Sequence, residues 1–305
     1  METINTRNKS GFVACIGRTN VGKSTLINSL LRQKITVVSL RPQTTRKRQL
    51  GILTIHDDLI SSQIAFIDTP GVHFPLNKLG ELMNHEIKKT LQECDLTLIV
   101  VDASKPPEKE DRIIPDMLKS VRRNIPTLVA LNKIDKIDEI NFQFNRDAFQ
   151  QLFPGVEMIA ISATNGDNIK DLLDRIVARL PIAPPFFPED QLTDLNERDI
   201  AADLIRESSL NILKDEVPHG IAVRIDQYIE RNEHGAYIEA TLFVEKESHK
   251  AILIGKDGKM LKRIGTAARK EIEVMNGRKV FLRLKVKVHK NWRNDLKVLR
   301  LFGYS

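Results

Sequence analysis

The stretch "GRTNVGKS", residues 17–24, decides the fold of the first half of the chain. It fits the pattern G-x-x-x-x-G-K-S, and it follows an apolar run, "GFVACIG" (11–17), and opens a helical pattern. Gly17 and Gly22 let backbone N–H groups converge on phosphates, and the helix dipole adds positive potential there. In such a loop Lys23 reaches the outer phosphates and Ser24 binds Mg²⁺. The stretch therefore predicts a strand, a phosphate-binding loop and a helix.

Short apolar runs alternate with helical patterns as far as residue 180. The further runs are "QIAFID" (63–68), "LTLIVVDA" (96–103), "PTLVALN" (126–132) and "VEMIAIS" (156–162). Near-continuous apolar strands between helices are typical of a mostly parallel sheet with helices on both faces. Ligands of such open sheets bind at the carboxyl ends of the strands, which is where the polar motifs of this half fall.

Two of these motifs suit the metal and the terminal phosphate of a nucleotide. "DTPG" (68–71) ends a strand, so Asp68 can hold the Mg²⁺ shell while the N–H of Gly71 meets a γ-phosphate. "QTTR" (43–46) lies between the phosphate loop and this motif, and we choose Thr45 over Thr44 as the Mg²⁺ contact.

Two further motifs suit a guanine base. "NKID" (132–135) follows a strand, and Asp135 can accept both N–H bonds from the guanine edge, which adenine does not offer. Because a hydrogen bond to a charged group contributes about 1.5–3 kcal/mol, guanine should be preferred clearly. "SAT" (162–164) ends the last strand and can support the base from the other side. Any one tetrapeptide is most simply a turn, but five motifs in this order at strand ends favour a guanine-nucleotide site.

Length and composition limit the class of protein. At 305 residues the chain can form two domains. It has no run of about 18 uncharged apolar residues and no apolar signal core at its start, so neither a membrane span nor secretion is expected. Cys15 and Cys94 lie in apolar segments without metal-ligand neighbours, which indicates buried thiols in a reducing cytosol.

The positive charge of the chain lies near its C-terminus. Residues 246–305 hold 17 Lys+Arg against 5 Asp+Glu, a net charge of +12, whereas the whole chain carries +7. A basic end on a slightly acidic body favours a polyanionic partner for that end. A basic surface that serves only solubility is the alternative.

A second domain is predicted after a proline-rich linker. "LPIAPPFFPEDQLTD" (180–194) has four prolines within eight residues, which favours stiff, extended chain. We assign residues 1–181 to the first domain, 182–197 to the linker and 198–305 to the second domain.

The second domain has its own order of predicted elements. A helix (198–216) precedes two alternating runs around "RNEHG", which indicate a hairpin. A helix, the turn "GKDG" (255–258), another helix (258–275) and the strand "VFLRLKVKVH" (280–289) follow.

The turn "GKDG" is too short to be a second nucleotide loop, and it lacks a terminal G-K-S/T. The order helix–strand–strand–helix–GxxG–helix–strand resembles the prokaryotic-type KH domain, which clamps about four nucleotides of single-stranded RNA with this loop. Gly255 and Gly258 allow close backbone approach and Lys256 supplies charge; an ordinary helix–helix turn is the alternative. The apolar groove beside the loop is expected to draw on Ile252, Leu253, Ile254, Leu261 and Ile264.

Basic residues after the turn are expected to widen the RNA footprint. The strand face with Arg283, Lys285 and Lys287, and the stretch "HKNWRNDLKVLR" (289–300), suit phosphate contacts, so binding should weaken steeply with salt. Trp292 could stack on a base, but we favour packing in the core for it.

The order of the motifs is similar to that of translation-factor-like GTPases. With the second domain, the chain resembles the Era family of bacterial ribosome-assembly GTPases over nearly its full length. The resemblance implies an α/β P-loop GTPase domain followed by a smaller α+β KH domain. It also implies hydrolysis of GTP to GDP with Mg²⁺, and binding of the 3′ region of small-subunit ribosomal RNA during assembly of the 30S subunit.

Matching the motifs residue by residue gives three sets of expected site residues. The nucleotide-binding set is Gly17, Arg18, Thr19, Asn20, Val21, Gly22, Lys23, Ser24, Thr25, Asp68, Thr69, Pro70, Gly71, Val72, Asn132, Lys133, Asp135, Ser162 and Ala163. Within the nucleotide site, Lys23, Thr45 and Gly71 are expected to act in catalysis, and Ser24, Thr45 and Asp68 to hold Mg²⁺. The RNA-binding set is Ile254, Gly255, Lys256, Asp257, Gly258, Lys259, Arg283, Lys285 and Lys287.

Three positions bear on the rate of hydrolysis. Val72 stands where many GTPases carry a water-orienting glutamine, so we expect slow turnover unless a partner activates it. His73 follows it and is more simply a bystander than a base. Relatives that use potassium carry asparagine at the position of Asn20, which makes Asn20 a candidate K⁺ ligand; closing a turn is its alternative role.

Two other functions are weighed against this one. The first is an RNA-binding assembly scaffold whose nucleotide is structural and scarcely hydrolysed. The second, a membrane-associated trafficking GTPase, is disfavoured by the KH-like half and by the lack of a lipidation signal. We expect a cytoplasmic monomer whose basic end makes, at most, weak peripheral contact with anionic lipid at the inner face of the cell membrane.

Overall fold

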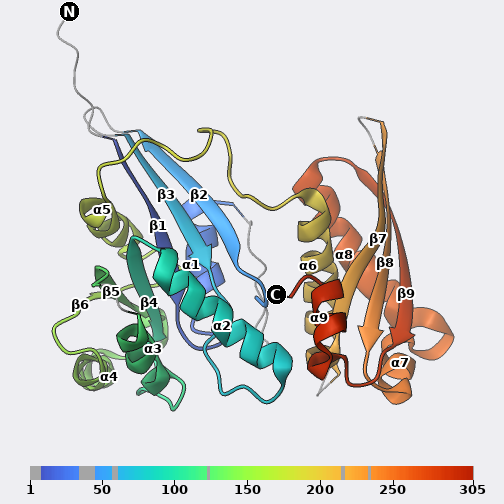
Figure 1. Ribbon diagram of the computed structural model, residues 1–305, viewed down its shortest axis with the longest axis horizontal. Helices are drawn as coiled ribbons and strands as arrows, with labels where there is room; N and C mark the ends of the chain where they lie inside the picture. Colours follow the sequence, from blue (N-terminus) through green and yellow to red (C-terminus); the bar gives the residue numbers. More distant parts are fainter. Residues whose placement is uncertain are drawn as a thin grey trace, which may run out of the picture. The chain divides into compact units, whose positions relative to one another are not determined.

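The structure is a computed structural model, and it describes residues 8–33, 45–56, 61–121, 124–213, 217–232 and 235–304. The described residues form two compact units, the first before residue 195 and the second chiefly from residue 195 onward (Figure 1). Among these residues, no helix is long and apolar enough to cross a membrane.

The first unit contains a six-stranded sheet in the order β2-β3-β1-β4-β5-β6. All neighbouring strands are parallel except β2 and β3, which are antiparallel. The strands are β1 (Lys9–Ile16), β2 (Gln49–His56), β3 (Ser61–Asp68), β4 (Leu96–Asp102), β5 (Thr127–Asn132) and β6 (Glu157–Ala160). The mostly parallel sheet is confirmed, and β2 is an antiparallel edge strand that the apolar runs did not reveal.

Helices cover both faces of this sheet (Figure 1). They are α1 (Lys23–Leu31), α2 (Lys78–Glu93), α3 (Ile114–Ser120), α4 (Glu139–Leu152) and α5 (Ile169–Arg179), with short 3₁₀ turns η1 (Asp111–Ile113) and η2 (Ile134–Lys136). Strand β4 shows why the apolar runs are continuous. Leu98 and Val100 join the core under α1 and α5, while Ile99 and Val101 join the core under α2, α3 and α4. Both faces are buried, so apolar residues fall on both of them and do not alternate with exposed polar residues.

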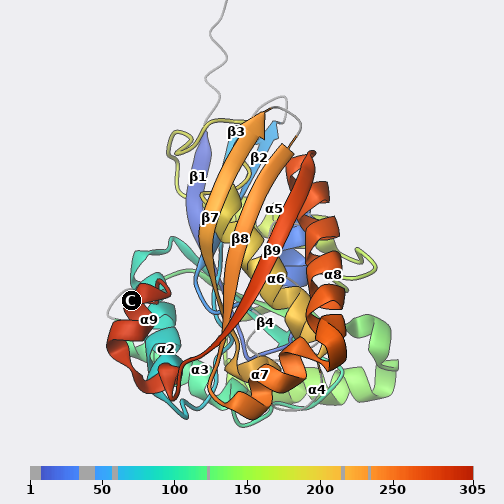
Figure 2. The ribbon, with the colours of Figure 1, turned by 90° about the vertical axis from the view of Figure 1, so that its right-hand side faces the viewer.

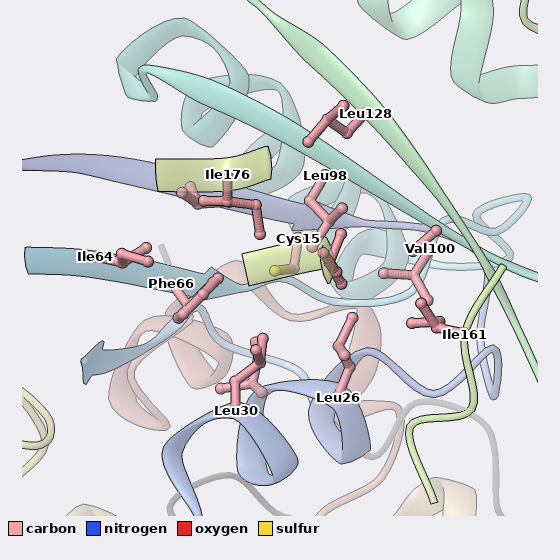
Figure 3. Close-up of a cluster of buried hydrophobic side chains, with 14 of the residues drawn as sticks. Cys15, Leu26, Leu30, Ile64, Phe66, Leu98, Val100, Leu128, Ile161 and Ile176 are labelled. Carbon is pink, nitrogen blue, oxygen red and sulfur yellow. The ribbon is translucent and has the colours of Figure 1, made fainter. Parts of the chain in front are cut away.

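Figure 3 shows the first of these two cores. Leu26 and Leu30 of α1 and Ile176 of α5 point toward Phe66 and Leu98 of the sheet. Cys15 lies in the same core, and both cysteines are buried free thiols, as predicted. Burial raises the pKa of the Cys15 thiol well above its usual value, so the group stays protonated.

The proline-rich stretch after α5 runs along the sheet rather than away from it. The side chain of Gln63, on β3, donates from Nε2 to the carbonyl O of Phe187 (2.8 Å). Its Oε1 accepts the backbone N–H groups of Phe186 (2.7 Å) and Phe187 (2.9 Å). Farther along, the N–H of Ile52, on β2, donates to the carbonyl O of Leu192 (2.8 Å). Proline removes backbone donors from this stretch, and the Gln63 side chain satisfies several of the groups that are left.

The second unit is a three-stranded sheet, ordered β7-β8-β9, with helices packed on one face (Figure 2). β7 and β8 form an antiparallel hairpin, and β8 pairs with β9 in parallel. In chain order the elements are α6 (Glu197–Ile212), η3 (Pro218–Gly220), β7 (Ala222–Asn232), β8 (Gly235–Val244), α7 (Glu247–Ile254), η4 (Lys256–Gly258), α8 (Lys259–Asn276), β9 (Lys279–Val288), η5 (Trp292–Asn294) and α9 (Leu296–Leu301). This order is the one predicted, although α6 ends at Ile212, earlier than expected.

Candidate nucleotide and nucleic-acid sites

The loop 17–24 leaves β1 and turns into α1, as the sequence predicts. Gly22 caps α1 with a φ of 102°, in the left-handed region, and a Cβ there would lie 2.4 Å from Nδ2 of Asn132. A glycine is therefore required both by the backbone and by the neighbouring loop. The first turn of α1 contains no acidic residue that would oppose an anion.

The side chain of Lys23 lies within this loop. Its Nζ donates to the carbonyl oxygens of Gly17 and Arg18, each at 3.0 Å. Burial lowers the pKa of Lys23 to about 8, against the pull of nearby Asp68 in the other direction. A buried ammonium held by two carbonyl groups is suited to bind an anion placed in the same loop.

Three oxygen-bearing side chains meet beside Lys23. Ser24 Oγ and Thr45 Oγ1 both donate to Oδ2 of Asp68, at 2.7 and 3.1 Å, and the two hydroxyl oxygens are 3.2 Å apart. The other oxygen, Asp68 Oδ1, is buried and has no hydrogen-bond partner among the described residues. Burial raises the pKa of Asp68. Carboxylate and hydroxyl oxygens are ligands that Mg²⁺ accepts, and an unpartnered buried oxygen fits a metal ligand. Thr44, the alternative to Thr45, lies outside the described residues.

The "DTPG" segment closes against the phosphate loop. Val72 N–H donates to the carbonyl O of Gly17 (2.9 Å), and a Cβ on Gly71 would lie 2.8 Å from the backbone of Thr19. The Val72 side chain is fully buried in the core under α2, α3 and α4. It therefore cannot orient a water molecule, and slow hydrolysis stays a prediction. His73 donates from Nδ1 to the carbonyl O of Gly71 (2.8 Å), which ties its ring to the segment.

The two base motifs and the phosphate loop are joined by side-chain hydrogen bonds. Asn132 donates to the carbonyl O of Val21 (2.8 Å) and accepts the N–H of Ala163 (2.9 Å). Ser162 Oγ donates to Oδ1 of Asp135 (2.6 Å). The Asp135 residue is exposed, so its carboxylate can also accept hydrogen bonds from a base edge. All three loops follow parallel strands, which brings them to one edge of the sheet.

Lys133 holds the same edge together from a strained position. Its backbone φ is 70°, in the left-handed region. Its Nζ donates to the carbonyl O of Asn20 (2.7 Å) and to Asp102 Oδ2 (2.6 Å). This contact of the lysine with the phosphate loop is a structural role that the tetrapeptide alone did not indicate.

The side chain of Arg18 has a role that the sequence did not reveal. Its Nε donates to Oδ2 of Asp111 (3.1 Å), and its terminal nitrogen lies 3.1 Å from Glu108 and 3.9 Å from Asp102. The Asp111 residue is fully buried, and burial raises the pKa of its carboxyl despite the paired arginine. The side chain of Arg18 is therefore held by carboxylates, which leaves its backbone for the predicted nucleotide contact. Asp111 stands in the polar stretch "PPEKEDR", where no pattern marks it as buried.

In the second unit, the "GKDG" turn joins α7 to α8. Gly255 has a φ of 72°, and a Cβ there would meet Met260 at 2.6 Å. Gly258 also has a left-handed φ, 73°, but open space surrounds it. The turn between them has Asp257 in the left-handed region. Open space at Gly258 leaves room for a ligand backbone to approach.

A groove of about 480 Å³ begins at this turn and lies between α8 and β9. It is lined by Gly258, Leu261, Lys262, Gly265, Thr266, Arg269, Phe281, Leu282, Arg283 and Leu284. Of the five apolar residues expected in the groove, only Leu261 lines it. Leu253 and Ile264 are fully buried in the core, so the prediction was wrong for them. The helical period explains the difference, since Ile264, Ala268 and Ile272 face the sheet and the residues between them face the groove.

Lys262 and Arg269 are groove residues that the prediction missed. They repeat at helical spacing on the side of α8 that carries no core residue, a signal that the sequence does contain. Of the predicted basic strand residues, Lys285 hydrogen-bonds Glu239, and Arg283 lies 3.6 Å from the same carboxylate. Trp292 is fully buried and donates from Nε1 to the carbonyl O of Gly220 (3.0 Å), which confirms that it packs in the core.

Together, the parallel sheet with its five nucleotide motifs and the sheet with the GxxG turn define a P-loop GTPase joined to a KH domain. Comparison with known proteins supports both halves. Residues 12–133 match the family of 50S ribosome-binding GTPases, and residues 216–293 match the KH domain family.

The full chain is similar to known Era GTPases. It is 44% identical to GTPase Era of Caldanaerobacter subterraneus, over 97% of this chain and 98% of that protein. It is 46% identical to GTPase Era of Caldicellulosiruptor saccharolyticus, with the same coverage. A crystal structure of Era with MgGDPNP and nucleotides 1506–1542 of 16S ribosomal RNA aligns with a TM-score of 0.90 and 39% identity, over 97% of this chain and 99% of that one. A crystal structure of a variant of Aquifex aeolicus Era bound to GDP·AlF4⁻ aligns with the same TM-score, identity and coverage. The chain belongs to the Era family of GTPases, and it hydrolyses GTP.

Proposed function

We propose that this GTPase uses its nucleotide state to control how the KH domain holds the 3′ region of small-subunit ribosomal RNA during assembly of the 30S subunit. The observation that carries the proposal is the presence, in one chain, of a complete guanine-nucleotide site and of a cationic groove that opens at a GxxG turn. Era bound to 16S ribosomal RNA in the similar crystal structure supports the RNA assignment.

In the nucleotide site, we assign different residues to the phosphates, to Mg²⁺ and to the base. The backbone N–H groups of the loop and the Lys23 ammonium bind the phosphates, and the N–H of Gly71 meets the γ-phosphate. Ser24, Thr45 and Asp68 are the residues that would hold Mg²⁺, which when bound neutralises charge on the β- and γ-phosphates. Asp135 selects guanine, and Ser162 holds its carboxylate in place. Val72 supplies no polar group, so water must be oriented by an element from elsewhere.

A monovalent cation is part of the proposal. Asn20 lies in the phosphate loop with a left-handed φ of 63°, and Lys133 fixes its carbonyl group. We place K⁺ beside the side-chain oxygen of Asn20, where it would add positive charge next to the phosphates. Hydrolysis should then be faster in K⁺ than in Na⁺, and Asn20→Ala should abolish the difference. Equal rates of the wild type in the two salts would overturn this part.

The RNA site combines a backbone clamp with nearby cations. Lys256 lies within the turn and Lys259 follows it, and Lys262 and Arg269 line the groove. If four such cations displace counterions, the affinity should fall with a slope of about −3 in a plot of log K against log salt concentration. Replacing Lys256 and Lys259 together by alanine should reduce the slope by more than one. A slope unchanged in that variant would contradict the clamp.

The proposal also covers the location of the protein in the cell and its oligomeric state. Two buried free thiols fit the reducing cytoplasm. The basic C-terminal part suits weak peripheral contact with anionic lipid, which flotation with phosphatidylglycerol vesicles would detect. We propose a monomer, which sedimentation velocity tests directly.

The central experiment maps the bound RNA by crosslinking in cells, for the wild type and for Lys23→Ala. The proposal expects crosslinks in the 3′ region of the small-subunit RNA, and an altered occupancy of that site in the variant together with loss of GTPase activity. Phe144→Ala, which removes an exposed side chain of α4, serves as the control. Crosslinks confined to messenger or transfer RNA would overturn the ribosomal assignment. Normal occupancy and function in Lys23→Ala would instead support a scaffold with a structural nucleotide.

A further inference from the structure

The face of the second sheet opposite α6 and α8 displays a row of apolar side chains. Ile229 of β7 pairs with Tyr237 of β8, and Tyr237 pairs with Phe281 of β9. Residues paired in this way share one face of a sheet. This is the face turned toward the viewer in Figure 2, with α6 behind the strands. We call these three residues the aromatic row.

The aromatic row has the geometry of a stacking surface. The rings of Tyr237 and Phe281 are nearly parallel, at 11°, with centroids 5.6 Å apart. The guanidinium of Arg231 lies 5.2 Å from the centroid of the Tyr237 ring. Nevertheless, 64% of Phe281 is exposed, and β9 is the edge strand of the sheet. The side of the Phe281 ring turned away from Tyr237 therefore has no neighbouring strand to cover it.

Elsewhere on the same face, an aromatic side chain is covered. Phe243, six residues along β8 from Tyr237, packs against Phe302 from the C-terminal segment at a centroid distance of 4.7 Å. Phe243 is thereby buried, although it stands on the same face as Tyr237. Exposure is thus a property of the aromatic row and not of the whole face.

The aromatic row continues into the RNA groove. Phe281 and Arg283 line that groove and also belong to the open face, so a strand leaving the groove past β9 meets the row next. The surrounding charge suits a polyanion. Arg231 lies at the row. Glu239 pairs with Arg283 at the next position on the same face, and its carboxylate is already bound by Lys285 and by Arg283. Flat rings beside guanidinium groups are what unstacked bases bind, largely without regard to sequence.

We propose that the aromatic row is a stacking platform for a base of single-stranded RNA that lies just outside the GxxG groove, with Phe281 as the stacking residue. This inference rests on the proposed RNA-binding function. It adds a contact to a base, beyond the backbone clamp at "GKDG" and the phosphate contacts of the basic strand.

The test measures binding of the full chain to an RNA of nucleotides 1506–1542 of 16S ribosomal RNA, the one seen with Era. Phe281→Ala should weaken binding about 5- to 150-fold, the range for loss of one stacked base. Because stacking neutralises no phosphate, the salt dependence of binding should keep its slope. Phe281→Trp should bind at least as well as the wild type.

A series of RNAs, each with one abasic position, locates the stacked base. For one abasic RNA, the wild type should lose as much affinity as Phe281→Ala loses for the intact RNA, and the variant should lose nothing more. Phe144→Ala is the matched control, since it removes an equally exposed phenylalanine, 70% accessible, from α4. Unfolding followed by the fluorescence of Trp292, the one tryptophan, shows whether the variants remain folded.

Two results would overturn the platform. In the first, Phe281→Ala binds the intact RNA as Phe144→Ala does. In the second, Phe281→Ala binds the intact RNA more weakly than the wild type, but it loses further affinity with every abasic RNA, as much as the wild type does. No single base would then depend on the Phe281 ring. The Lys256→Ala/Lys259→Ala variant separates this failure from failure of the proposed function. If that double variant binds like the wild type, or the wild type does not bind, the KH clamp itself is refuted; if it binds weakly, only the platform fails.

Discussion

The Gln63 side chain provides a sharp test of how residues 182–194 are held. Gln63 is 1% exposed and makes three hydrogen bonds to the backbone of Phe186 and Phe187. A typical hydrogen bond contributes about 0.5–1.5 kcal/mol net, so Gln63→Ala should lower the free energy of opening this stretch by about 2–4 kcal/mol. The amides of Phe186 and Phe187 should then exchange with deuterium roughly 30- to 1,000-fold faster, if local opening governs their exchange.

Hydrogen exchange followed by NMR or mass spectrometry measures this directly. Amides of β4, in the centre of the sheet, should keep their protection from exchange, because the substitution acts at β3 and at the stretch 182–194 that packs against it. Gln150→Ala is the control, since Gln150 is exposed on α4 and makes one long contact, 3.4 Å, to the carbonyl O of Phe153. Equal exchange at Phe186 and Phe187 in the wild type and in Gln63→Ala would show that Gln63 does not hold the stretch.

Two further predictions concern charged groups. The hydrogen bond from Lys285 lowers the pKa of Glu239 below its ordinary 4.5, so the stability it contributes is present above that pH and lost as the pH falls through the lowered pKa. Glu239→Gln should therefore flatten the acid unfolding curve of the second unit below about pH 4.5, as followed by Trp292 fluorescence; an unchanged curve would contradict the pairing. Asp111→Ala removes one partner of a buried ion pair, for which the typical loss is about 3–5 kcal/mol; because Glu108 stays 3.1 Å from Arg18, we expect about 3 kcal/mol. Urea denaturation measures the loss, which replacing Arg18 by methionine as well should partly reverse.

The strands and the nucleotide motifs could be predicted because each depends on local sequence. A strand buried on both faces, such as β4, needs an unbroken apolar run, and a loop that binds phosphate needs glycines and a lysine at fixed spacing. The position of Thr45 beside Ser24 and Asp68 followed from the order of the motifs and is what the structure shows.

What could not be predicted depends on contacts between distant residues. Asp111 pairs with Arg18 across 93 positions, and Gln63 binds a backbone 124 positions away. Strand β2 was missed because glycine and polar residues interrupt its apolar run, as its sequence QLGILTIH shows. Ile264 was assigned to the groove, although the spacing of Ile264, Ala268 and Ile272 does specify the buried side of α8.

The stretch that follows α5 also affects how the sheet meets other molecules. β2 is an edge strand, and an uncovered edge presents N–H groups with which a second chain can pair. Here the N–H groups of Leu50 and Ile52 donate to Asp194 (3.3 Å) and to the carbonyl O of Leu192. Residues 192–194 thus occupy these two donors of β2, which leaves a second chain fewer groups with which to pair at this edge of the sheet.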